Sequence, residues 1–153
     1  YQLRIRETTI KDTLLISSKE TYNHYPSSKE VYTVIDRLLN YISQNNAKPD
    51  GYPMMHIDSV SPIKYEAMLA VPINKQIPET SQFKLKRMVR GKLLTAVFKG
   101  GDYRTRNAMR QISDYVRDYK RASPAIPYFS LISNRMQVSD SSQWETTVNF
   151  PVF

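Results

Sequence analysis

The sequence has no cysteine, only two histidines and only four glycines. The absence of cysteine excludes a disulfide framework, thiolate metal sites and thiol nucleophiles. No stretch approaches the roughly 18 consecutive apolar residues that a membrane helix needs, and no signal peptide is recognisable. Because the chain opens on Tyr1 in a stretch that already alternates like a strand, we expect it to be a piece of a longer protein.

What is present is typical of a globular domain. The 153 residues are 41% hydrophobic and 11% aromatic, which is enough for one ordinary domain or two small halves that share a core. The formal net charge is +8, and the excess lies in residues 79–153, where thirteen Lys and Arg face six Asp and Glu. This half could bind nucleic acid or an acidic partner. No aromatic residues interleave with Lys84–Lys92 as a stacking platform requires, which favours a solvated strand and helix face.

The clearest pattern is the alternation in residues 144–152 at the end of the chain. A large, mostly apolar face consists of Trp144, Thr146, Val148, Phe150 and Val152, while Glu145, Thr147, Asn149 and Pro151 form the other face. Such alternation predicts a strand with one packed face. Residues 65–73 repeat the design, with Glu66 at the position of Glu145 and Val-Pro-Ile matching Phe-Pro-Val. We infer an internal duplication.

Two helices are predicted in corresponding places. Ser27 and Glu30 form a capping-box pattern that starts a helix running to about Asn45. A second helix is predicted at 103–121 with Asp102 as its N-cap. Their apolar stripes are related by a shift of 77 residues and comprise Val31, Ile35, Leu38, Leu39 and Ile42 in the first helix and Ala108, Ile112, Tyr115, Val116 and Tyr119 in the second.

Strands are predicted at 3–10, 13–18, 53–57 and 64–73, and again at 83–91, 92–98, 128–133 and 143–153. The Leu14-Leu15 pair matches Leu93-Leu94, and Pro72 matches Pro151, each by a shift of 79 residues. The predicted fold class is therefore α+β, with two tandem strand–helix–strand–strand repeats related by a pseudo-twofold axis. The repeats are residues 1–73 and 83–153, joined by a polar linker at 74–82.

In each repeat one sheet face is covered by the helix, and the other has no partner within the repeat. That second face carries Glu66 in the first repeat and Glu145, Thr147 and Asn149 in the second. Burying such groups without hydrogen bonds costs about 1–3 kcal/mol each. We therefore expect the antiparallel sheets to form a central groove between the repeats, and a concave site of this kind is the default place for a ligand.

Several side chains have the chemistry of a ligand-binding wall. Glu66 and Glu145 can pair with a cationic ligand, or each can be the cross-strand partner of a nearby Lys or Arg; both interpretations stay open. Tyr103 and Tyr128 offer flat apolar bodies with a polar tip, and Met68 suits an adaptable pocket wall. His56 and Asp58 share a strand face, but two ligands do not make a metal site, and no cofactor is indicated.

Three features together carry a family resemblance. They are the ending Trp-x-Thr-x-Val-x-x-Pro-Val at 144–152, the run Lys99-Gly100-Gly101-Asp102-Tyr103 before a helix, and the duplication. Over essentially its whole length the chain resembles the GyrI-like superfamily, which includes the effector-binding domains of AraC-type and MerR-type regulators. The resemblance implies that a small, often cationic and aromatic-rich effector binds in the central groove. It also implies a cytoplasmic protein with a DNA-binding domain upstream in a longer chain.

The family carries an acidic residue where this sequence has Thr147, and the equivalent position in the first repeat is Met68. Glu145 and Glu66, two residues away on the same strand faces, can take over the lost charge. The ligand-binding set that we predict is Glu66, Met68, Tyr103, Tyr128, Glu145 and Thr147.

Three functions are therefore considered. The first is a non-catalytic ligand-sensing domain. The second is a small-molecule hydrolase of the same superfamily, in which Glu145 would activate a water molecule. The third is an interaction module for DNA or protein that uses the basic second half. No catalytic group is predicted for the favoured function, and the sequence identifies neither the ligand nor the oligomeric state.

Overall fold

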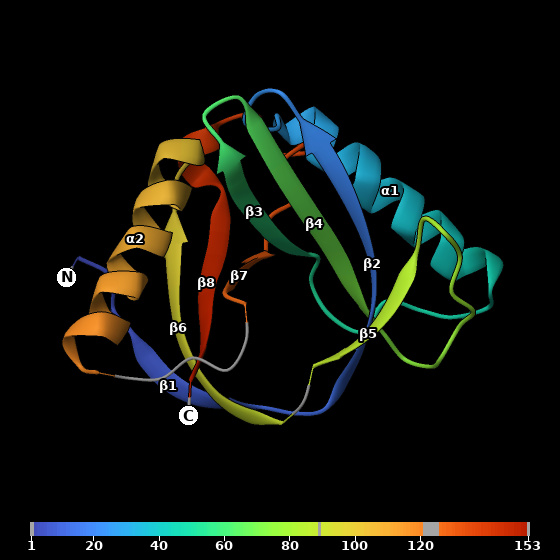
Figure 1. Cartoon of the computed structure of the whole chain (residues 1–153), viewed down its shortest axis with the longest axis horizontal. Helices are drawn as coiled ribbons and strands as arrows, with labels where there is room; N and C mark the ends of the chain where they lie inside the picture. Colours follow the sequence, from blue (N-terminus) through green and yellow to red (C-terminus); the bar gives the residue numbers. More distant parts are fainter. Residues whose placement is uncertain (1, 89, 121–125, 153) are drawn as a thin grey trace. The chain divides into compact units, whose positions relative to one another are not determined.

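The computed structural model describes residues 2–88, 90–120 and 126–152 (Figure 1). The described residues form two α-helices and eight β-strands, so the predicted α+β class is confirmed. The chain divides into two compact units. We call Asp12–Met88 the inner unit, and Tyr1–Lys11 with Val89–Phe153 the terminal unit.

The inner unit is an antiparallel sheet with one helix. Its strands are β2 (Thr13–Tyr22), β3 (Met54–Ser61), β4 (Lys64–Ile73) and β5 (Lys84–Met88), in the spatial order β3-β4-β2-β5. Helix α1 (Ser28–Gln44) begins at the predicted capping box. The Glu30 N–H donates to Ser27 Oγ at 3.2 Å, and the Ser27 N–H donates to Glu30 Oε1 at 3.0 Å.

The core of the inner unit lies between α1 and the face of β2 and β4 that it covers (Figure 1). The predicted stripe of α1 is confirmed at four positions, because Val31, Ile35, Leu38 and Ile42 are buried, while Leu39 is only half-buried. From the sheet, Ile16, Leu69 and Val71 are fully buried. Each such side chain contributes about 1.5–3 kcal/mol when it leaves water, so this apolar layer dominates the stability of the unit.

The terminal unit has the same kinds of element. Its strands are β1 (Arg6–Ile10), β6 (Gly91–Lys99), β7 (Tyr128–Leu131) and β8 (Glu145–Val152), in the order β1-β6-β8-β7. Helix α2 (Asp102–Asp118) packs on β8 and β6. A 3-10 turn at Ser141–Gln143 precedes β8. The helix buries Thr105, Ala108, Ile112 and Val116.

Several details of α2 differ from the prediction. Its N-cap is Gly101, and Asp102 is its first helical residue, so the predicted Asp102 cap is wrong. The helix ends at Asp118, while the predicted end at Arg121 lies outside the described residues, as does Phe153 at the predicted end of the last strand. Tyr119 is 62% exposed rather than part of the buried stripe. The reason is that it already follows the last helical residue, where its ring packs on Tyr115 at 4.4 Å between centroids.

The two short edge strands, β1 and β5, belong to other sheets than the sequence predicts. The predicted repeats place residues 1–11 in the first repeat and 83–88 in the second. In the structure β1 pairs with β6, with Arg6 opposite Thr95, and β5 pairs with β2, with Lys84 opposite Ser17. Alternation predicts that a segment is a strand, but it carries no information about which sheet edge the strand extends.

Candidate functional site

The face of the terminal sheet opposite α2 carries a polar network centred on Asn149. Side chains of β8 alternate, so Thr146 and Val148 are buried on the helix side while Thr147 and Asn149 lie on the other face. Asn149 Oδ1 accepts a hydrogen bond from Thr95 Oγ1 at 2.8 Å. Asn149 Nδ2 donates to Ser130 Oγ at 3.0 Å and to Thr147 Oγ1 at 3.3 Å. Both ends of the amide are therefore engaged, and its orientation is defined.

The register of the strands explains why these residues meet. Asn149 of β8 lies opposite Thr95 of β6 and opposite Tyr128 of β7. Thr147 lies opposite Ser130. Directly opposed residues of an antiparallel pair share a face with Cβ atoms about 4.5–5.5 Å apart. The network thus crosses three strands, and Tyr128 of β7 lies beside it, opposite Asn149.

Tyr128 is a neutral phenol at physiological pH. Burial raises the pKa of Tyr128 to about 12, since the phenolate would lose hydration. A partly buried tyrosine of this kind offers a flat apolar ring together with a hydroxyl that can donate or accept. This combination suits the recognition of a planar ligand.

Glu145 and Glu66 differ in their partners. Glu66 Oε1 lies 3.7 Å from Lys19 Nζ, so here the cross-strand interpretation holds. Both side chains are about half exposed, and such a pair contributes about 0–1 kcal/mol. For Glu145, by contrast, none of the ion pairs found among the described residues involves its carboxylate, even though Lys99 lies opposite it in the register. The backbone of Glu145 is bonded to Ser133 as well as paired with β6: its N–H donates to Ser133 Oγ and its carbonyl accepts from the Ser133 N–H.

The six predicted ligand residues fall into three places. Tyr128, Thr147 and Glu145 lie together on the face of the terminal sheet opposite α2. In the inner unit, Glu66 and Met68 share the sheet face opposite α1, where Met68 lies between Lys19 and His56. Tyr103 joins neither group. It lies in the first turn of α2, on the helix that covers the opposite sheet face, and is 78% exposed.

Three residues outside the predicted ligand set complete the polar network on the face of the terminal sheet opposite α2. Asn149 was assigned to this face but not to the ligand set, and Thr95 and Ser130 were not selected at all. The signal for Asn149 was present, because it is an amide at an alternating position beside Thr147. Thr95 and Ser130 become recognisable only when the pairing of β6 and β7 with β8 is known.

The structure also has cavities away from these residues. One of about 270 Å³ lies within the terminal unit, and one of about 480 Å³ lies within the inner unit; none of the six predicted residues lines either of them. Among the residues that the structure describes, no three His, Asp or Glu side chains gather as metal ligands would. In the same residues, neither helix is long and apolar enough to cross a membrane.

Neither a protein-family model nor a curated protein sequence matches this chain. Solved structures do match. The C-terminal domain of EcmrR superposes with a TM-score of 0.82 at 15% identity, covering 100% of this chain and 99% of that one. For EcmrR in a cryo-EM structure of its complex with DNA, the TM-score is 0.81 at 16% identity. There the match covers 98% of this chain but 57% of that one, so the chain spans little more than half of that protein's length.

Two further structures share the fold. SAV2435 bound to tetraphenylphosphonium matches with a TM-score of 0.61 at 15% identity, covering 98% of this chain and 94% of that one. A hydrolase from Listeria innocua matches with a TM-score of 0.66 at 9% identity, covering 97% of this chain and 91% of that one. The chain therefore shares its fold with the C-terminal domain of EcmrR and with SAV2435.

Proposed function

We propose that this chain is a GyrI-like ligand-sensing domain that binds a small organic molecule on the polar sheet faces opposite its helices. The observation that carries the proposal is the Asn149 network, which orders polar groups of three strands beside the Glu145 carboxylate. A rigid sheet that presents fixed donors, acceptors and a ring is the kind of surface on which ligand sites are built.

Equivalent positions in the two units support an internal repeat. The inner sheet has the order β5-β2-β4-β3, and the terminal sheet has the order β1-β6-β8-β7. Leu15 lies opposite Pro72, as Leu93 lies opposite Pro151. This register matches Leu15 with Leu93, a shift of 78 residues, instead of the predicted match with Leu94. That the two free faces wall one groove, about a pseudo-twofold axis, stays a prediction.

The favoured ligand is a cation with aromatic rings. The Glu145 carboxylate can pair with a ligand cation without first giving up a protein partner, since none of the ion pairs among the described residues involves it. Tyr128 supplies a ring face for the same ligand. The binding of tetraphenylphosphonium by SAV2435, which has this fold, supports the choice of ligand class. The structure of EcmrR with DNA supports a regulator context, in which a DNA-binding domain would belong to a longer, cytoplasmic chain.

The experiment is a calorimetric titration with tetraphenylphosphonium, a neutral aromatic of similar size and a tetraphenylborate control. We expect tetraphenylphosphonium to bind. Glu145→Gln should reduce the affinity roughly tenfold or more, because the ligand loses a charged partner. Glu66→Gln is the matched variant, and we expect a smaller loss because Glu66 is already paired with Lys19. If no cation or neutral aromatic binds, or if both variants bind like the wild type, the proposal fails.

A hydrolase is the second candidate, because Glu145 is a carboxylate outside every ion pair among the described residues and a hydrolase from Listeria innocua shares the fold. In that function Glu145 would take a proton from a water molecule that attacks the substrate. Glu145→Gln should then abolish turnover of ester or amide substrates while ligand binding persists. Turnover that survives this substitution would dismiss Glu145 as the base.

A further inference from the structure

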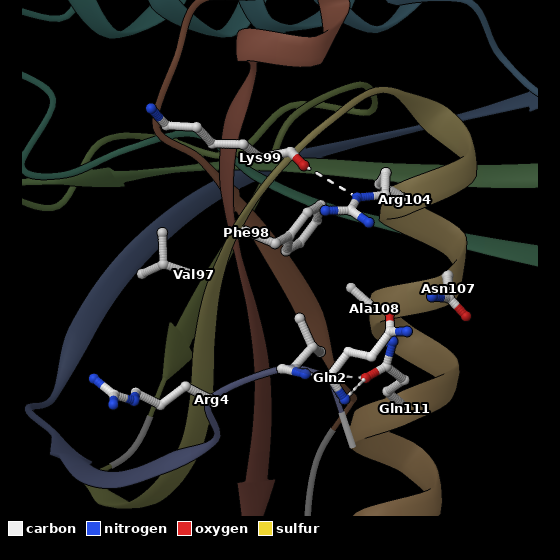
Figure 2. A pocket seen from close by; sticks show the side chains of 10 residues that line it. Gln2, Arg4, Val97, Phe98, Lys99, Arg104, Asn107, Ala108 and Gln111 are labelled. Carbon is white, nitrogen blue, oxygen red and sulfur yellow. Dashed lines mark hydrogen bonds between the residues drawn. The ribbon is translucent and has the colours of Figure 1, made fainter.

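The cavity of the terminal unit lies where the chain leaves the edge of its sheet (Figure 2). Strand β1 pairs with β6 only as far as Arg6, which lies opposite Thr95. Beyond that point, residues 2–4 separate from β6, and a cavity of about 270 Å³ remains between this segment, the end of β6 and α2. It does not include Asn149, Tyr128 or Glu145.

One wall of the cavity is a stripe of α2. Arg104, Asn107 and Gln111 line it from three consecutive turns, because residues three and four apart share a helix face (Figure 2). Gln111 Oε1 accepts hydrogen bonds from the backbone N–H groups of Gln2 at 2.9 Å and Leu3 at 3.1 Å. These contacts hold the segment against the helix and define which end of the amide is oxygen.

The side chains of Asn107 and Arg104 on the same wall are also held by hydrogen bonds. Asn107 Oδ1 accepts a hydrogen bond from Arg110 Nη2 at 2.6 Å. Arg104 Nε donates to the Lys99 carbonyl at 3.3 Å, as Figure 2 shows. Both amide oxygens of this wall therefore already accept hydrogen bonds. The donors of the wall that no hydrogen bond found among the described residues uses are Arg104 Nη1 and Nη2, Asn107 Nδ2 and Gln111 Nε2.

The charges around the cavity have one sign. Of the described residues that line it, Arg4, Lys99 and Arg104 are charged, and none carries a carboxylate. None of the ion pairs found among the described residues involves these three cations. In Figure 2 the head groups of Arg4 and Lys99 lie on either side of Val97, on the side of β6 away from α2. The floor is apolar, with Phe98 and Ala108 buried.

We propose that this cavity binds a small organic anion, a carboxylate or a phosphate monoester with a compact apolar body. The anionic group accepts hydrogen bonds from Arg104, Asn107 and Gln111, and the apolar body lies against Leu3 and Phe98. Arginine is well suited because its planar fork presents two parallel donors to such groups. The volume of about 270 Å³ equals about nine waters at about 30 Å³ each, which fits an acid with a single ring.

This site goes beyond the function proposed above, and its ligand has the opposite charge. The competing explanation is that these cations only keep α2 and the β6 edge in water, as charged side chains on edges commonly do. The two explanations differ in one respect: a solvated surface needs no particular orientation of its amides, whereas an anion site depends on the donor ends of Asn107 and Gln111.

The test is a calorimetric titration of the chain with benzoate and with phenyl phosphate at low salt, and with benzylammonium as the cationic counterpart. Asn107→Asp and Gln111→Glu are nearly isosteric. Each keeps the oxygen that accepts from Arg110 or from the Gln2 and Leu3 amides, and each replaces the donor with a second oxygen. Arg104→Met removes the fork, and Arg106→Met, on the same helix but outside the cavity lining, is the matched control.

We expect at least one of the two anions to bind, with affinity reduced roughly tenfold or more in Asn107→Asp, Gln111→Glu and Arg104→Met and unchanged in Arg106→Met. Benzoate without phenyl phosphate assigns a carboxylate ligand, and the reverse assigns a phosphate ligand. The proposal is overturned if neither anion binds, if benzylammonium binds as tightly, or if the three variants bind like the wild type. Tetraphenylphosphonium titrated into the same variants separates the two proposals, because its binding should not depend on these residues.

Discussion

Arg135 Nη2 donates a hydrogen bond to Thr146 Oγ1 at the start of β8, at 2.9 Å. The same nitrogen donates to Thr105 Oγ1 of α2 at 3.2 Å, and Nη1 lies 3.6 Å from Asp102 Oδ1. The guanidinium also lies over the Trp144 ring at 4.9 Å from the ring centroid. One buried arginine thus ties the segment before β8 to the first turn of α2.

Arg135→Leu should therefore destabilise the terminal unit substantially. The substitution leaves the buried Thr105 and Thr146 hydroxyls without their common donor and removes a side chain that is only 5% exposed. We expect a loss of about 2–4 kcal/mol in the free energy of unfolding, measured in urea. Arg117→Leu is the control, since this arginine is 73% exposed and its ion pairs should contribute less than about 1 kcal/mol. Equal losses in both variants would show that Arg135 does not anchor the segment.

Asn149 and Thr95 should be energetically coupled. Thr95→Val removes the hydroxyl that donates to Asn149 Oδ1, and Asn149→Ala removes the amide that joins Thr95, Ser130 and Thr147. We expect losses of about 1 kcal/mol and about 1–3 kcal/mol in unfolding free energy. The double variant should lose less than the sum, by about 0.5 kcal/mol or more, as residues in one network do. Strict additivity in urea unfolding would contradict the network.

The capping box of α1 should be measurable on its own. Ser27→Ala removes the oxygen that accepts from the Glu30 N–H, and we expect a loss of about 1 kcal/mol. Ser43→Ala lies on the exposed surface of the same helix, where alanine has the higher helix propensity, so stability should be unchanged or slightly raised. Thermal unfolding of the two variants provides the comparison, and a Ser27→Ala variant as stable as the wild type would show that the cap contributes nothing.

Tyr128 should make the folded chain sensitive to alkali. Its pKa is raised from 10.0 to about 12 in the folded state by burial. The folded chain then holds this proton more tightly than the unfolded chain, so stability is fully present below pH 10 and is lost as the pH rises towards 12. The two-unit shift corresponds to about 2.7 kcal/mol at most.

Urea unfolding at pH 9 and at pH 11.5 measures this loss. The free energy of unfolding of Tyr128→Phe should fall less between the two pH values than that of the wild type, since residue 128 then has no phenol to ionise. The free energy of unfolding of Tyr119→Phe, a substitution at a 62% exposed position, should fall as much as that of the wild type. A Tyr128→Phe variant with the wild-type pH dependence would contradict the raised pKa.

Local patterns predicted the parts of the fold whose causes are local. The box of Ser27 and Glu30 spans four residues, and the structure contains it with both hydrogen bonds formed. The alternation of β8 placed Val148 and Asn149 on opposite faces, as observed, because successive side chains of a strand point to opposite sides. Trp144, however, precedes β8, where its Nε1 donates to the Val138 carbonyl at 2.8 Å and its ring packs on Arg135.

The candidate sites depended on contacts between distant residues. Whether Glu66 or Glu145 would have a cationic partner could not be predicted from two similar strand patterns, because the partner Lys19 belongs to another strand. Gln111 holds the segment at Gln2 across more than a hundred residues of chain, and this contact determines which end of its amide faces the cavity.

The sequence by itself determined the α+β class, the two helices with most of their buried stripes, except Leu39, Tyr115 and Tyr119, and the faces of β4 and β8, since each of these follows from a repeat of two or 3.6 residues. Only the tertiary structure decided which edges β1 and β5 extend, which carboxylate is paired and where Arg135 is buried. The physical reason is that the periodicity of apolar residues is a property of residues close in the sequence. The pairing of strands and of charged groups depends instead on which distant surface offers the better register, hydrogen bonds and charge.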